Sequence, residues 1–215
     1  TGQKGYHPLL ASRADTGEIL HVRLRKGSSQ KGANRFIEEL IARVRRAGAA
    51  GEILLRADSG FWSRKLIDTL DRLGVKFSIT AAMNPAIRAR IEQIPEGGWV
   101  PITYPDGGTA EVASFAYLSK GKKRDGQSPR TVRMIVRRTR LVGKQAALFP
   151  DWRHHIFVTN RCDTDVTLID REHRHHAVVE LAIRDLKEGA GLAHVPSGHF
   201  SANGAWLACA ALAHN

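Results

Sequence analysis

The first 82 residues alternate between short apolar runs and amphipathic segments. Residues 6–12 and 18–24 are short strand-like runs joined by ADTG, whose Asp and Gly are typical of a tight hairpin turn. EILLRAD at 52–58 and VKFSIT at 75–80 are nearly continuous apolar runs, as expected of strands that are buried on both faces. The pattern therefore predicts a β-hairpin followed by two further strands.

Two amphipathic helices are predicted between these strands. Asn34 can cap the first helix and Gly48 can end it, while Gly74 follows the second. Apolar residues recur in the two helices at three- and four-residue spacing, at Phe36, Ile37, Leu40, Ile41 and Val44 and then at Leu66, Ile67, Leu70 and Leu73. This order predicts an α/β fold with a mixed sheet flanked by helices. Ligands of such sheets bind off the carboxyl ends of the strands, where Asp58 stands.

The pattern changes after residue 83, where hairpin-like segments replace the alternation of strands and helices. A short helix at 85–94 precedes strand-like runs at 99–104, 111–118 and 131–141. We interpret this region as a β-rich insertion into the core. The predicted parts are a first core segment at 1–82, the β-rich basic insertion at 83–155 and a C-terminal core segment at 156–215.

The C-terminal segment returns to the core pattern. HIFVTN at 155–160 is expected to rejoin the sheet. Residues 167–189 are predicted to form one long helix that ends at Gly189, and a last helix begins near residue 202. The chain starts without Met and stops inside this last helix, so we expect a piece of a longer protein.

Charge narrows the choice of partners. Lys and Arg exceed Asp and Glu by 33 to 21, which gives a net charge of +12 and favours a polyanion such as nucleic acid. The region 119–144 has one acid, Asp125, and ten basic residues: Lys120, Lys122, Lys123, Arg124, Arg130, Arg133, Arg137, Arg138, Arg140 and Lys144. The two cysteines are far apart in sequence, and no apolar run is long enough to span a bilayer. A soluble protein of the reducing cytoplasm is expected.

The predicted long helix combines acidic and basic side chains on one face. At about 100° per residue, four side chains fall within about 40° of Glu180. They are His173, His176, Arg184 and Lys187. A carboxylate at a strand end and another on a later helix are what two-metal phosphoryl transfer needs, because Mg²⁺ prefers oxygen ligands. Asp58 and Glu180 are therefore the candidate catalytic and metal-binding residues.

The runs LRADSGFW, HHAVVELAIRDLKEG and GLAHVPSGHFSANGAWLACAALAHN resemble the DDE transposases of bacterial insertion sequences. The resemblance implies an RNase H-like core with a β-rich insertion that cuts and joins DNA strands with Mg²⁺ or Mn²⁺. It also implies double-stranded DNA as partner, a homodimer in the intact protein, and Asp58 and Glu180 as the second and third acids of the site.

The helix signature of this family is Tyr, two residues, Arg, three residues, Glu, six residues, Lys. Glu180 and Lys187 fit it, whereas His173 stands at the Tyr position and His176 at the Arg position, with Arg174 as a possible replacement. The candidate DNA-binding residues are Lys187, Arg184, His173, His176, Arg174, Lys122, Lys123, Arg133 and Arg137.

The family's first Asp lies upstream of the opening hairpin, and Asp15 in the hairpin turn is a poor substitute. The chain is therefore expected to bind DNA, and one metal weakly, without catalysing strand transfer by itself.

Two other interpretations stay open. A zinc site could be built from His154, His155, His173, His175 and His176, although not all of them can converge. A non-catalytic nucleic-acid-binding module could use a basic face of the strand that contains Val132, Met134 and Val136. Both the module and the transposase predict salt-sensitive DNA binding, but only the transposase needs Asp58 and Glu180 to come together.

Overall fold

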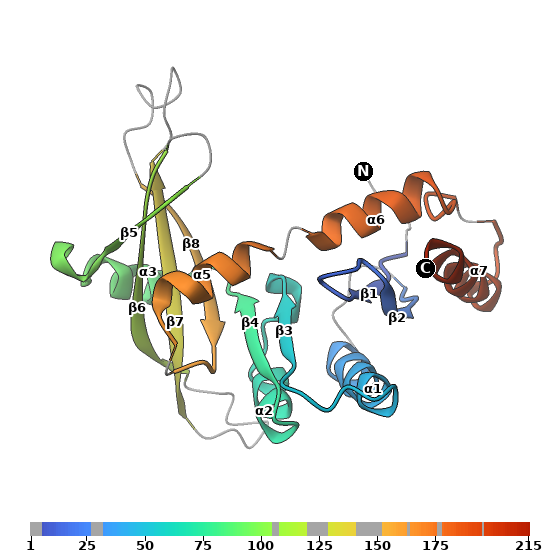
Figure 1. Cartoon of the computed structure of the whole chain (residues 1–215), viewed down its shortest axis with the longest axis horizontal. Helices are drawn as coiled ribbons and strands as arrows, with labels where there is room; N and C mark the ends of the chain where they lie inside the picture. Colours follow the sequence, from blue (N-terminus) through green and yellow to red (C-terminus); the bar gives the residue numbers. More distant parts are fainter. Residues whose placement is uncertain are drawn as a thin grey trace. The chain divides into compact units, whose positions relative to one another are not determined.

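The structure is a computed structural model, shown in Figure 1, in which two compact units are distinguished. It describes residues 6–26, 32–104, 108–119, 129–140, 152–162, 164–175, 178–194 and 196–215. The hairpin unit comprises residues 1–51 and 175–215, and the sheet unit comprises residues 52–174. The predicted boundaries near residues 82 and 155 do not separate these units, because strands on both sides of each boundary belong to one sheet.

The sheet unit is built on six strands in the order β3-β4-β8-β7-β6-β5 (Figure 1). Their bounds are β3 Leu54–Ala57, β4 Lys76–Thr80, β5 Val100–Ile102, β6 Thr109–Ser119, β7 Arg130–Arg140 and β8 Arg153–Thr159. The β3–β4 pair is parallel and the other pairs are antiparallel, which confirms the predicted mixed sheet. The strands of the predicted insertion continue the core sheet, and β8 rejoins it between β4 and β7 as expected.

Three α-helices and two short 3-10 helices accompany the described strands of the sheet unit. They are η1 Ser59–Phe61, α2 Arg64–Arg72, α3 Pro85–Glu92, η2 Glu96–Gly98 and α5 Val166–Arg174. Ser63 caps α2 by accepting a hydrogen bond from the Leu66 N–H at 3.2 Å, and Gly74 follows it with φ 65°, as predicted. On α5, Ile169 packs against Ile135 and Phe157.

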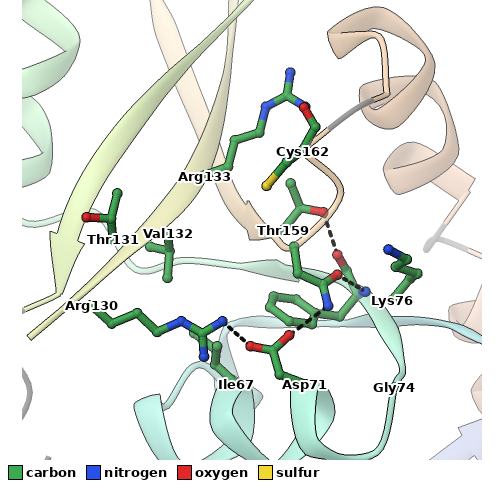
Figure 2. A pocket seen from close by; sticks show the side chains of 12 residues that line it. Ile67, Asp71, Gly74, Lys76, Arg130, Thr131, Val132, Arg133, Thr159 and Cys162 are labelled. Atoms are coloured by element: carbon green, nitrogen blue, oxygen red, sulfur yellow. Dashed lines mark hydrogen bonds and ion pairs between the residues drawn. The ribbon is translucent and has the colours of Figure 1, made fainter. Parts of the chain in front are cut away.

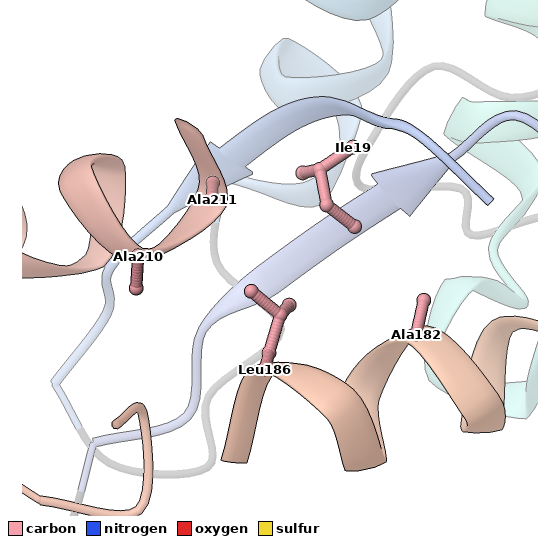
Figure 3. Packing of buried hydrophobic residues seen from close by; sticks show 5 residues of the cluster. All are labelled: Ile19, Ala182, Leu186, Ala210 and Ala211. Atoms are coloured by element: carbon pink, nitrogen blue, oxygen red, sulfur yellow. The ribbon is translucent and has the colours of Figure 1, made fainter. Parts of the chain in front are cut away.

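The hairpin unit contains β1 Leu9–Ser12, β2 Ile19–Arg23, α1 Ala33–Arg46, α6 Val178–Glu188 and α7 Phe200–His214. The predicted hairpin is confirmed, but among the described residues it forms a two-stranded sheet of its own. Ile19 of β2 packs against Ala182 and Leu186 of α6 and against Ala210 and Ala211 of α7 (Figure 3). This small core holds α6 in place.

Three local predictions need correction. Helix α1 begins after Gly32, whose φ is 88°, so Asn34 lies inside the helix and does not cap it. Strand β3 is at the edge of its sheet and buries alternate residues, not both faces. The predicted long helix is described as two helices, α5 in the sheet unit and α6 in the hairpin unit. None of the described helices is long and apolar enough to cross a membrane.

An ionic cluster joins the hairpin to α1. The Glu39 carboxylate accepts hydrogen bonds from Arg23, from Arg35 at 2.9 Å and from the His21 ring at 3.1 Å. Burial raises the pKa of Glu39, but these donors outweigh it and lower the pKa to about 2. Burial also lowers the pKa of His21, against the opposing effect of its hydrogen bond with Glu39. The ring of His21 stacks on Phe36 with 4.5 Å between centroids.

Acidification is expected to destabilise the hairpin unit in two stages. Below the ordinary His value of 6.5 the unfolded chain gains a proton that His21 in the folded chain does not, so stability falls. Glu39 contributes stability above its ordinary value of 4.5, and this is lost as the pH falls toward about 2. Urea unfolding of the chain and of Glu39→Gln over this pH range measures both stages. An unchanged low-pH loss in the variant would contradict the role of Glu39.

Candidate active site

Asp58 lies at the carboxyl edge of the sheet unit. It follows β3 directly, and β3 runs parallel to β4 with Ala57 opposite Ile79. Its Oδ1 accepts a hydrogen bond from the Gly60 N–H at 2.9 Å, which starts the 3-10 turn η1. A Cβ at Gly60 would lie 2.9 Å from this oxygen, so glycine is needed to keep the carboxylate in place. The residue is exposed, so its carboxylate is accessible to an ion from solvent.

Glu180 lies in the first turn of α6 in the hairpin unit. The side chain is exposed, and a carboxylate at this end of a helix is favoured by the helix dipole. Arg184 and Lys187 are also exposed, four and seven residues further along, so the predicted basic row beside Glu180 is present on α6. Ala182 and Leu186 are buried as predicted, whereas Leu181, expected on the same apolar side, is 50% exposed.

Asp58 and Glu180 thus belong to different compact units, and each is accessible within its own unit. Among the described residues, no group of three or more His, Cys, Asp or Glu side chains could hold a metal ion. The two carboxylates offer oxygen donors alone, which suits Mg²⁺ or Mn²⁺ and does not suit softer ions. The chemistry of each carboxylate therefore suits the expected metal, and the two carboxylates belong to separate units.

Arg137 has a different environment from the one predicted for a DNA-binding residue. It is buried under α5, where its Nη1 donates to Asp170 Oδ1 at 2.7 Å. Asp170 is completely buried, and Arg174 Nε lies 3.1 Å from its other carboxylate oxygen, as an ion pair without hydrogen-bond alignment. Asp170 is not among the predicted residues, although its four-residue spacing from Arg174 is visible in the sequence.

His173 is also part of the interior of the sheet unit. Its exposed fraction is 3%, its ring stacks on Phe157 at 3.9 Å, and its Nδ1 lies 2.8 Å from the Ser78 hydroxyl. A buried ring of this kind presents no donor to a phosphate group at the surface. His173 was predicted to lie on the same helix face as Glu180 because one continuous helix was expected. His173 lies in α5 and Glu180 in α6, so the two residues do not share a helix face.

The other predicted DNA-binding residues divide into two groups. Arg133 donates to backbone carbonyls at Arg161, at 2.7 Å, and Thr164, at 3.0 Å, and so ties β7 to the segment before α5. Arg174, besides its ion pair with Asp170, donates to the Thr103 carbonyl at 3.4 Å. The remaining candidates, His176, Lys122 and Lys123, lie outside the described residues.

Other arginines of β7 also pair with groups of the protein itself. Arg138 donates to Glu96 and Glu111 and lies between two tryptophan rings, 4.2 Å from the centroid of Trp99 and 4.5 Å from that of Trp152. Its hydrogen bond with Glu96 and the one with Glu111 raise its pKa against the effect of burial. Within the described part of the basic region, much of the positive charge is therefore used inside the protein, and the predicted basic face of β7 is covered by α5.

A cavity of ≈ 380 Å³ in the sheet unit is lined by residues of α2, β4 and β7, among them Asp71, Lys76 and Arg130 (Figure 2). Arg130 and Asn160 both donate to the Asp71 carboxylate in its wall. Lys76, which also lines the cavity, begins β4, whereas Asp58 follows the carboxyl end of the parallel strand β3. The cavity is thus separate from the candidate active site.

A mixed sheet with flanking helices and a carboxylate at its carboxyl edge is consistent with an RNase H-like domain. Residues 1–215, the whole chain, match the family model described as transposase DDE domain group 1. The chain therefore belongs to this family of transposases, which act on DNA, and the predicted membership of the DDE transposases is confirmed. A comparison with curated proteins found no match.

The Arg137→Met variant is expected to lower the free energy of unfolding by about 3 kcal/mol, because it leaves the buried Asp170 carboxylate with one guanidinium fewer. Arg171→Met, an exposed residue of α5 next to Asp170, should change it by less than about 0.5 kcal/mol. Urea denaturation measures both values. Weaker DNA binding by Arg137→Met at full stability would instead support the predicted phosphate contact.

Proposed function

We propose that this chain is part of the catalytic domain of a DDE transposase that cleaves and joins DNA strands with Mg²⁺ or Mn²⁺. Asp58 and Glu180 act as two of its metal-binding carboxylates. The observation that carries the proposal is the position of Asp58, exposed at the carboxyl edge of a mixed sheet in a chain that belongs to the DDE family. Bound divalent ions would supply activation of the attacking hydroxyl and stabilisation of the leaving oxygen.

The protein's own residues hold and orient these carboxylates. Strand β3 gives Asp58 a stiff support, and the Gly60 N–H fixes the rotation of its carboxylate by binding Oδ1. On α6, burial of Ala182 and Leu186 leaves Glu180 directed to solvent, where it can reach a shared ion. We infer that Asp58 and Glu180 are ligands of the same pair of ions.

Phosphate contacts are assigned to Arg184 and Lys187. Both are exposed on the α6 face that carries Glu180, so a DNA backbone held by them would lie next to the carboxylate. The buried residues Arg137 and His173 are left out of this assignment. We also propose that the protein comes from an insertion sequence, forms a homodimer and is located in the cytoplasm. These three points are based on the resemblance to bacterial DDE transposases.

The chain itself is proposed to lack strand-transfer activity, because a first aspartate has no counterpart among its described residues. Asp15 is the nearest candidate in sequence, but its carboxylate is paired with Arg13 at 2.7 Å in the hairpin turn. The hydrogen bond from Arg13 is the main reason that the pKa of Asp15 is lowered. This pairing fits a turn residue better than a bridging metal ligand.

Manganese binding tests whether the two carboxylates share an ion. Asp58→Asn and Glu180→Gln are each expected to weaken Mn²⁺ binding at least tenfold, about 1.4 kcal/mol, in titrations followed by electron paramagnetic resonance. Glu188→Gln, an exposed acid in the last turn of α6, is the matched control and should leave the affinity unchanged. If Glu180→Gln behaves like this control while Asp58→Asn does not, the shared site is refuted.

Plasmid nicking tests the missing aspartate. With Mg²⁺ or Mn²⁺ present, this chain is expected to leave supercoiled plasmid intact, because two carboxylates do not complete a two-metal site. Gel electrophoresis over a range of protein concentrations measures the conversion to nicked circles. Robust cutting that disappears in Asp58→Ala would show that the chain already holds all of its catalytic carboxylates.

A further inference from the structure

Two histidine rings of the sheet unit face each other at their Nε2 atoms. His155 lies on β8 and His173 on α5, and their Nε2 atoms are 3.4 Å apart. The ring centroids are separated by 5.5 Å, with the planes inclined by 37°. This end-to-end arrangement directs the Nε2 atom of each ring toward the space between them.

The contacts around His173 fix its orientation. Its Nδ1 lies 2.8 Å from the Ser78 hydroxyl, and its ring is stacked on Phe157 with an interplanar angle of 14°. A hydrogen bond at one ring nitrogen of this kind orients the other nitrogen as a metal ligand in proteins. The Thr80 hydroxyl lies 3.3 Å from the same Nε2 and adds an oxygen on the side of β4.

The separation of the two Nε2 atoms is compatible with a shared ion. Zn–N bonds of about 2.0–2.1 Å at a tetrahedral ion place two ligand nitrogens about 3.3–3.4 Å apart. Hydrogen bonds donated by N–H groups span about 2.7–3.2 Å between heavy atoms. The observed 3.4 Å matches the first geometry, and it is as long as the hydrogen bond from Arg174 to the Thr103 carbonyl.

We propose that His155 and His173 form a binding site for one borderline-soft divalent cation such as Zn²⁺. The Thr80 hydroxyl lies close enough to serve as a third donor, and solvent would complete a tetrahedral shell. The described residues gather no third His, Cys, Asp or Glu at this place, so the affinity is lower than that of a four-ligand structural zinc site. Imidazole ligands separate this site chemically from the Mg²⁺-type carboxylates of the proposed active site.

The ion would join three elements of the sheet unit, since the donors come from β4, β8 and α5. Thr80 ends β4 at the carboxyl edge that Asp58 also occupies, because Ala57 is opposite Ile79 in the parallel pair. A cation at this edge would hold α5 on the sheet. Zn²⁺ is therefore expected to raise the melting temperature of the chain, as does any ligand that binds only the folded state.

Calorimetric titration of the chain with ZnCl₂ tests the site. One equivalent should bind, and His155→Ala should weaken the affinity at least tenfold. His154→Ala is the matched control, because this neighbouring residue is directed toward Trp99, with ring centroids 6.3 Å apart, and should change the affinity less than twofold. His155 is half-buried, so its alanine variant is expected to fold, which circular dichroism checks.

Absorption spectroscopy with Co²⁺ is a second test of the same site. Four-coordinate nitrogen and oxygen ligation should produce an intense visible absorption band that His155→Ala abolishes and His154→Ala keeps. Absence of Zn²⁺ binding, or equal losses in the two variants, would overturn the proposal. It would also be overturned if Asp58→Asn removed Zn²⁺ binding while His155→Ala did not, since the ion would then occupy the carboxylate site.

Discussion

The attachment of α5 to the six-stranded sheet depends on a buried ion pair. Asp170 is fully buried and has Arg137 of β7 and Arg174 of its own helix beside it. A carboxylate in this position is tolerated only with its guanidinium partners, because an unpaired buried charge is very costly. The pair therefore fixes which side of α5 faces the sheet, and with it the positions of Ile169 and His173.

The same requirement explains where the basic residues of β7 are found. A net charge of +12 suggests a surface prepared for DNA, yet Arg133, Arg137 and Arg138 all bind groups inside the sheet unit. Net charge sums over residues and does not reveal which of them are already paired. The phosphate contacts are therefore assigned to the exposed α6 side chains Arg184 and Lys187, and not to β7.

The candidate carboxylates are supported in different ways. Asp58 depends on backbone geometry, since a strand end, a 3-10 turn and Gly60 set its position. Glu180 depends on the small core of the hairpin unit, in which Ile19 packs on Leu186. The proposed function gives these two acids a common role, as ligands of the same ions.

The sequence by itself determined the mixed sheet, the hairpin, the amphipathic helices and the placement of Asp58 at a strand end. These follow from apolar periodicity and from local signals such as Gly74, which act over a few residues. Tertiary structure alone decided that the predicted long helix is divided between two units, that His173 is buried and that Arg137 pairs with Asp170. The reason is that the burial of a polar side chain depends on partners far away in sequence, and a periodic pattern along one segment does not identify them.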